Sequence, residues 1–317
     1  MRLGQGAIPW WIFSQRTRVP GTTLLEYFWS IGLARAGADQ TVADVIPGRG
    51  PLWTRFWLPL TLAALNTTPD RAAAPLLWAV IAETFGKGAS ACRPILAPRG
   101  LGTALVDPAV AHLERQGAEI AFEHALKEVT SEGAHLAKLH FANGRTVDLG
   151  PDDRAVLALP PTRLKSVLPW IEVPRDDASI LNAHFLVDDP ALAEAPPITG
   201  MVNSTTHWLF VRGDVVSLTV SAADRLGLMS RAPDELIPML WQEVVQTLGL
   251  TRPYLAARIN KERRATFDQS PEGVKKRPDA RTPLANLILA GDATTTGLPA
   301  TIEGAIRSGE TAARLAA

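Results

Sequence analysis

The sequence has 317 residues, which is enough for two domains of ordinary size. Hydrophobic residues make up 46% and charged residues 20% of the chain, so it can bury a sizeable core. The 32 basic and 32 acidic residues balance, which argues against a nucleic-acid partner. Cys92 is the only cysteine, so no intramolecular disulfide can form and a reducing compartment is indicated.

Residues 1–90 are predicted to be helical, and Pro59 and Pro75 are expected to kink or restart their helices. The segments are apolar on most faces, so they should be buried or line an apolar cavity. The first 13 residues do not resemble a secretory leader, and no stretch approaches the roughly 20 apolar residues of a membrane-spanning helix. The cytoplasm is therefore the predicted location.

The middle of the chain changes in character near residue 95. The stretch "GLGTALVDPAVAHLERQG" predicts an amphipathic helix that ends at Gly117. Strand-like runs follow in "AEIAFEH", "ALKEVTS", "AHLAKLHF" and "TVDL", with a hairpin turn at Asn143-Gly144. The apolar run in "RAVLALPP", closed by Pro160 and Pro161, predicts a short buried strand.

Residues 177–220 alternate between polar and apolar side chains, which predicts strands with a turn at Gly213-Asp214. The stretch "DELIPMLWQEVVQTLG" predicts a helix that ends just before Gly249, and "PYLAARINKERRATF" predicts a further strand. The polar, proline-rich residues 270–283 are expected to form a surface loop.

The C-terminal stretch "LILAGDATTTGLPATIEGAIRSG" predicts a strand, a turn and a helix in succession. Gly291 would let the backbone pass close to a bound group, and Asp292 would place a carboxylate at the carboxyl end of the strand. Pro299 suits the first helical position, so the N–H groups of Ala300, Thr301 and Ile302 should be free. Together with the helix dipole, these donors favour an electron-rich group.

Small residues give the last helix a face that can approach a sheet or a flat ligand closely; they are Gly304, Ala305, Ser308, Gly309, Ala312 and Ala313. Ion pairs at i,i+4 are expected between Glu303 and Arg307 and between Glu310 and Arg314. Tight packing alone would explain the small face. The combination of strand end, Gly-Asp turn and free helix start favours a cofactor with hydroxyl groups and an acceptor that gains charge on reduction, as a flavin has.

Other motifs give no site. The sequence contains no G-x-G-x-x-G and no G-x-S-x-G, and its histidines show no metal-ligand spacing. His184 is interpreted as a core or pocket-wall residue. Lys261 and Asp224 are candidates for pocket polarity only, and no catalytic residue is assigned.

The string "LAGDATTTGLPATIEGAIRSG" resembles the C-terminal flavin motif of the amine oxidase/phytoene desaturase superfamily. It is similar, more narrowly, to the squalene-associated FAD-dependent desaturases, the hydroxysqualene dehydroxylases of hopanoid synthesis. Stretches that carry this narrower resemblance are "PWWIF", "LAALNTTP", "ACRPIL", "VLALPP", "NAHF", "WLFVR" and "KERRATF".

The resemblance implies a cofactor and a set of contacts. FAD would bind with its ribityl chain on Asp292 and with the N1/O2 edge of its ring facing Thr301 and Ile302. Leu126 falls where the family has its adenine-contacting strand residue, and Pro160 falls at the strand edge beside the cofactor. The implied reaction is the reductive removal of the hydroxyl of hydroxysqualene to give squalene, inside an apolar pocket.

The resemblance also implies a fold of mixed α/β (α+β) type. Residues 95–161 and 284–317 would form part of a Rossmann-like FAD-binding domain of the amine oxidase type. This domain would be interleaved with a helical and antiparallel-sheet substrate domain at 1–94 and 162–283. The partner would be a long apolar isoprenoid, with other enzymes of the squalene pathway and the inner face of the membrane as further candidate contacts.

One departure from the family pattern is large. Family members begin with a strand–G-x-G-x-x-G–helix unit that holds the FAD diphosphate, and this sequence does not contain it. We therefore expect an N-terminally truncated form that binds FAD weakly or not at all by itself. The alternative interpretations are a carotenoid desaturase-like or amine oxidase-like flavoenzyme, and a non-catalytic fragment.

Overall fold

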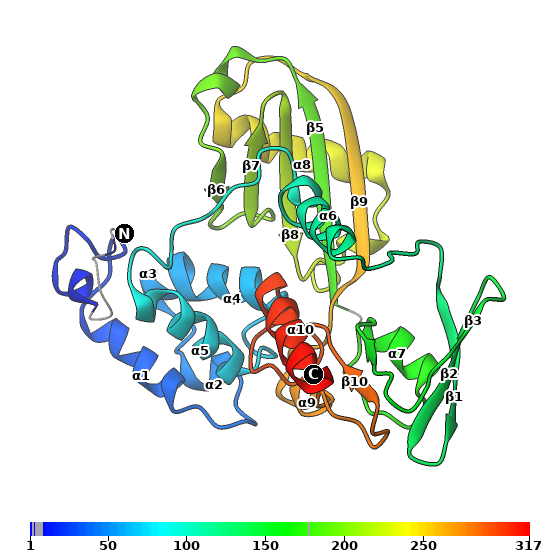
Figure 1. The fold of residues 1–317 in the computed structure, drawn as a ribbon. Coiled ribbons are helices and arrows are strands. Elements are labelled where there is room, and N and C mark those ends of the chain that lie inside the picture. The colour runs from blue at the N-terminus through cyan, green and yellow to red at the C-terminus, as the bar shows by residue number, and fades with distance from the viewer. Residues whose placement is uncertain (2, 4–8, 177) are drawn as a thin grey trace.

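The computed structural model describes residues 1, 3, 9–176 and 178–317. The first 13 residues, which were predicted not to form a secretory leader, therefore lie partly outside the described residues. Figure 1 shows a group of N-terminal helices, a five-stranded sheet with its own helices, and a region of short strands around the C-terminal helix. This mixture of helices and antiparallel strands confirms the predicted fold class.

The N-terminal third is helical, as predicted. Its main helices are α1 (Trp29–Ala34), α2 (Val42–Val45), α3 (Gly50–Leu52), α4 (Leu58–Leu65) and α5 (Ala74–Glu83), with a π-helical segment at Trp53–Trp57. Pro75 lies in the first turn of α5, where a missing N–H costs nothing. Pro59 instead follows the π-helical segment inside one continuous helical stretch from Gly50 to Leu65. Leu33, Trp57 and Leu77 belong to one buried apolar cluster that joins these helices.

A π-helical segment (Gly102–Val106) and α6 (Asp107–Arg115) form the predicted amphipathic helix, and Gly117 follows in a left-handed conformation with φ of 83°. The antiparallel strands β1 (Leu126–Glu132), β2 (His135–Phe141) and β3 (Thr146–Asp148) come next in the order β1-β2-β3, with the predicted turn at Asn143-Gly144. The strand expected in residues 118–124 is wrong, because these residues are not in a strand.

The five-stranded sheet has the order β6-β7-β8-β5-β9. Its strands are β5 (Ala178–Val187), β6 (Ile198–Gly200), β7 (Trp208–Arg212), β8 (Val215–Ser221) and β9 (Tyr254–Thr266). One face, with Leu181, Ala183 and Phe185, packs in a core with α8 (Pro233–Leu248). The opposite face carries Asn182 and His184, because side chains alternate along a strand.

The C-terminal region combines a short parallel pair of strands with one helix. Strand β4 (Ala155–Leu157) pairs with β10 (Leu287–Leu289), and α10 (Ile302–Ala316) packs against both. Two short helices, α7 (Pro161–Val167) and α9 (Pro271–Lys275), complete it. In Figure 1, α10 lies between the N-terminal helices and the β1–β3 hairpins.

Candidate cofactor site

The site begins where two parallel strands end. β4 and β10 are in register, and the N–H of Ala290 continues the ladder by donating to the carbonyl of Leu157 (2.9 Å). Their carboxyl ends therefore meet at one edge of the pair, with Pro160 after β4 and Gly291-Asp292 after β10. This is the edge at which α/β sheets bind ligands.

Gly291 makes the turn that follows β10. Its φ of 113° lies in the region that favours glycine, and its N–H donates to the Ser308 hydroxyl in α10 (2.7 Å). A Cβ built on Gly291 would meet no atom within 4 Å, so the space in front of the backbone is open. The turn is thus fixed to the helix while its outer side stays accessible to a ligand.

Helix α10 begins later than the sequence predicted. Thr301 is the N-cap and its hydroxyl accepts from the N–H of Gly304 (3.1 Å), so Ile302, and not Pro299, is the first helical residue. The N–H of Ala300 is not free, because it donates to the Gln269 side chain (2.9 Å). Within the described residues, the N–H groups of Ile302 and Glu303 have no protein acceptor.

The small-residue face of α10 is present and serves two surfaces. Gly304, Ser308 and Ala312 are buried, and a Cβ on Gly304 would lie 3.0 Å from the Pro299 carbonyl. Ala305 and Gly309 instead line the cleft beside the turn. The helix therefore packs closely on the preceding turn, and only small side chains border the cleft on this side.

A cleft of about 430 Å³ lies at this edge. Its lining includes Ala158, Leu159, Pro160, Pro161, Asp176, Arg264, Ala265, Thr266, Phe267, Ala290, Gly291, Asp292, Ala305 and Gly309. Of the predicted site residues, it brings Pro160, Gly291 and Asp292 together. Pro299, Thr301 and Ile302 lie outside its lining, and Leu126 has its side chain in the core below β1.

Burial controls the charges at the cleft. It raises the pKa of Asp292, and the N–H of Ala293 and the Arg277 guanidinium oppose this rise. Burial also lowers the pKa of Arg277 to about 10, which leaves it cationic at neutral pH. The residues present fit a flavin: a carboxylate for hydroxyl groups, open backbone at Gly291, and two helical N–H groups for an electron-rich edge.

Two residues that support this turn were not predicted from the sequence. Arg277 was assigned to a surface loop, but its side chain is buried and contacts the turn after β10. Gln269 is also buried and joins Ala300 to the carbonyl of Leu65 (2.7 Å). Both contacts span long sequence separations, so no local pattern signals them.

Lys261 and Asp224 have structural partners. Lys261 donates to the carbonyls of Met229 and Arg231, and Asp224 accepts from Ser179 and pairs with Arg225. Among the described residues, no group of three or more His, Cys, Asp or Glu side chains is arranged to hold a metal ion.

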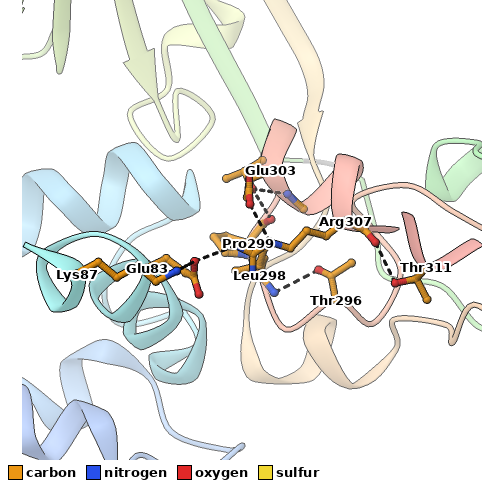
Figure 2. Close-up of polar contacts among 10 residues, drawn as sticks. Glu83, Lys87, Thr296, Leu298, Pro299, Glu303, Arg307 and Thr311 are labelled. Atoms are coloured by element: carbon orange, nitrogen blue, oxygen red, sulfur yellow. Dashed lines mark hydrogen bonds and ion pairs between the residues drawn. The ribbon is translucent and has the colours of Figure 1, made fainter. Parts of the chain in front are cut away.

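An ion-pair network joins α10 to the N-terminal helices (Figure 2). Arg307 contacts Glu303 one turn earlier (2.7 Å), as predicted, and also Glu83 at the end of α5 (2.8 Å). Lys87 adds a second cation to Glu83 (2.7 Å). Arg314 donates to Thr311 (3.2 Å) rather than to the expected Glu310. Helix α10 is therefore tied to the N-terminal helices.

The Glu83 network predicts a pH-dependent contribution to stability. Hydrogen bonds from Arg307 and Lys87 lower the pKa of Glu83 from 4.5 to about 2. A carboxylate with a lowered folded-state pKa stabilises the fold above its unfolded pKa and loses this effect as the pH falls toward the folded value. Glu83→Gln should lower Tm slightly at neutral pH and by less near pH 2, where about half of the wild-type Glu83 is protonated in the folded protein. An equal Tm difference at both pH values would contradict this.

Comparisons with known proteins agree with the fold. The family model for flavin containing amine oxidoreductases matches residues 39–317. The structure is similar to a putative protoporphyrinogen oxidase from Exiguobacterium, with a TM-score of 0.61 at 16% identity over 94% of this chain and 72% of that one. It is also similar to cyclohexylamine oxidase from Brevibacterium oxydans, with a TM-score of 0.61 at 13% identity over 92% of this chain and 73% of that one.

The fold and the matched family therefore define a flavin-dependent oxidoreductase of the amine oxidase type, with FAD as its cofactor. Within this class the chain belongs to the hydroxysqualene dehydroxylase family. It is 41% identical to the hydroxysqualene dehydroxylase of Sinorhizobium fredii, over 99% of this chain and 74% of that protein. It is 36% identical to that of Zymomonas mobilis, over 100% of this chain and 75% of that protein.

Proposed function

We propose that the protein removes the hydroxyl group of hydroxysqualene reductively, with FAD as cofactor, to give squalene. The observation that carries this proposal is the 36–41% identity to three hydroxysqualene dehydroxylases along nearly the whole chain. The cleft supports it, because its carboxylate and open glycine suit the ribityl and ring portions of a flavin. Outside the cleft lining, the N–H groups at the start of α10 are available to an electron-rich edge. When bound, reduced FAD would supply the hydride, and the hydroxyl would leave with one proton as water.

The proposal gives each predicted site residue a role. Asp292 accepts hydrogen bonds from the ribityl hydroxyls, and Gly291 and Pro160 lie beside the cofactor. Thr301 and Ile302 present backbone N–H groups to the ring edge, and Pro299 shapes the approach to them. Leu126 at the start of β1 is the proposed adenine contact, through its backbone because its side chain is buried. The proposed cofactor domain comprises 95–161 and 284–317, and the proposed substrate domain comprises 1–94 and 162–283. Residues of each also line the cleft or cavity assigned to the other.

Two cavities offer room for a long isoprenoid. One, of about 760 Å³, lies in the helical third and is lined by Trp29, Trp53 and Trp57 among others. The second, of about 720 Å³, lies between residues 95–101 and the sheet. Its wall includes His184, whose Nδ1 is 2.8 Å from the Ser217 hydroxyl, beside apolar residues such as Phe210. We propose that the hydroxyl-bearing part of the substrate binds in this second cavity, whose wall combines polar and apolar residues.

Access to such a substrate suggests peripheral contact with a lipid surface. Leu25, Phe28 and Trp29 line the larger cavity and are 75%, 54% and 48% exposed. Exposed aromatic and aliphatic side chains of this kind insert at lipid interfaces. Among the described residues, no helix has the length and apolar character needed to cross a bilayer. The proposal is therefore contact with one face of the membrane.

The test presents hydroxysqualene in lipid vesicles to the purified protein with chemically reduced FAD, and extracts squalene for mass spectrometry. We expect squalene to form in proportion to the protein added, and the protein to co-sediment with the vesicles. Phytoene and putrescine serve as matched alternative substrates. Turnover of either without squalene formation would reject the assignment, and failure to co-sediment would reject membrane contact alone.

A further inference from the structure

A single buried arginine holds the turn that follows β10. Arg277 follows α9, and its side chain is only 6% exposed. Its Nη1 donates to the carbonyl of Leu298 (2.8 Å), and its Nη2 donates to the carbonyl of Asp292 (2.9 Å). Nη2 also contacts the carbonyl of Thr294 and the hydroxyl of Thr296 (2.8 Å). One guanidinium thus contacts residues at both ends and in the middle of the turn 292–298.

The backbone around Arg277 holds the same turn from a second side. The Thr295 hydroxyl donates to the Arg277 carbonyl (2.9 Å), and the Thr295 N–H donates to the Pro278 carbonyl (2.9 Å). The Phe267 ring, which lines the cofactor cleft, lies 4.8 Å from the guanidinium carbon. Cation–π contact and three carbonyl acceptors are the features that let a cation remain in a buried place.

The chemistry of the contacts explains why arginine occupies this position. Three carbonyls and one hydroxyl point at the guanidinium from different parts of an irregular turn, and its rigid fork can bond several of them at once. A lysine ammonium keeps the charge but lacks the planar fork, so it cannot meet the same set. Without any cation here, the buried carbonyls of Asp292, Thr294 and Leu298 would lose a donor.

We propose that Arg277 is the positioning residue of the cofactor turn: it fixes residues 292–298 so that Asp292 faces the cleft, without itself lining that cleft. The link to the cofactor rests on the proposed function. The structural part of the claim does not, because it concerns the order of one turn in the protein alone. A residue that merely stabilised the fold would affect all regions alike, whereas a positioning residue affects this turn.

The test compares amide hydrogen exchange in the wild type, Arg277→Gln, Arg277→Lys and a matched control, Arg281→Gln, which removes an exposed arginine four residues away. We expect Arg277→Gln to speed exchange at Thr294, Thr295 and Thr296 by about tenfold or more. Their N–H groups donate to the carbonyls of Gly291, Pro278 and Thr294, and these bonds lie in or beside the turn that Arg277 fixes. Amides of β5 should be unchanged. Arg277→Lys should be intermediate and the control should match the wild type.

A second readout connects the turn to the cofactor. FAD affinity is measured for Arg277→Lys, for Asp292→Asn and for the double variant. If Arg277 acts by placing Asp292, the double variant should bind no more weakly than Asp292→Asn alone. Unchanged exchange in the turn, an equal rise in exchange throughout the chain, or additive losses of affinity would each overturn the proposal. Absence of FAD binding by the wild type would contradict the proposed function instead, and the exchange data would still decide the role of Arg277.

Discussion

Asp292→Asn is expected to weaken flavin binding by about 10- to 100-fold, because hydrogen bonds to a charged group contribute roughly 1.5–3 kcal/mol. The substitution keeps the shape of the side chain and removes its charge. Ligand-observed NMR titration with FAD and riboflavin gives the ratio of the two affinities directly.

Asp279→Asn is the matched control, because Asp279 is an exposed carboxylate in the neighbouring segment. It should bind flavin as the wild type does. The raised pKa of Asp292 adds a second expectation: wild-type affinity should begin to fall, as the pH is lowered, above the ordinary aspartate value of 3.8. If Asp292→Asn and the wild type bound riboflavin with equal affinity, Asp292 would not be a flavin-binding residue.

Gly273→Ala is expected to destabilise the protein more than alanine at any other glycine with a described Cβ environment, because its added Cβ has the shortest contact. A Cβ on Gly273 would lie 2.1 Å from the Asp268 carbonyl oxygen and 2.9 Å from its carbonyl carbon, so the backbone must move. Overpacking of this kind costs about 1–3 kcal/mol and sometimes more, which corresponds to several degrees in Tm. Calorimetry of the variant measures the change.

The damage from Gly273→Ala should reach the cofactor turn, because Gln269 lies in the same tight segment. Its side chain bonds Ala300 and Leu65, and its carbonyl accepts from the N–H of Ala73 (2.9 Å). Gly102→Ala is the control, since no atom lies within 4 Å of its Cβ position. We expect an unchanged or slightly higher Tm there. A Gly273→Ala protein with wild-type Tm would show that the Asp268 contact is not as tight as described.

Local sequence signals were sufficient for most elements. Strands of both antiparallel sheets were predicted from alternating polar and apolar side chains and from the turns at Asn143-Gly144 and Gly213-Asp214. The end of α8 was predicted from Gly249. The strand–turn–helix at the C-terminus was predicted together with its Gly-Asp turn and small-residue face. These features depend on neighbours in sequence, which is why pattern and spacing reveal them.

Features that depend on distant residues were not predicted. The start of α10 was wrong by three residues, because the Thr301 hydroxyl caps the helix while Gln269 occupies the Ala300 N–H. Arg277 was assigned to a surface loop because a charged residue among prolines usually is exposed. The Arg277 side chain can be buried because carbonyls of the turn 292–298 accept its hydrogen bonds, and these contacts are not visible in the local sequence.

The most direct test of the central claim, that flavin binds at the carboxyl ends of β4 and β10, is photolabelling with 8-azido-FAD followed by peptide mapping. We predict labelled peptides that carry cleft residues such as Pro160, Phe267 or Gly309, and their loss when unlabelled FAD is added in excess. Labelling confined to residues 95–101 and the sheet, or labelling that excess FAD does not reduce, would contradict the site described for this chain.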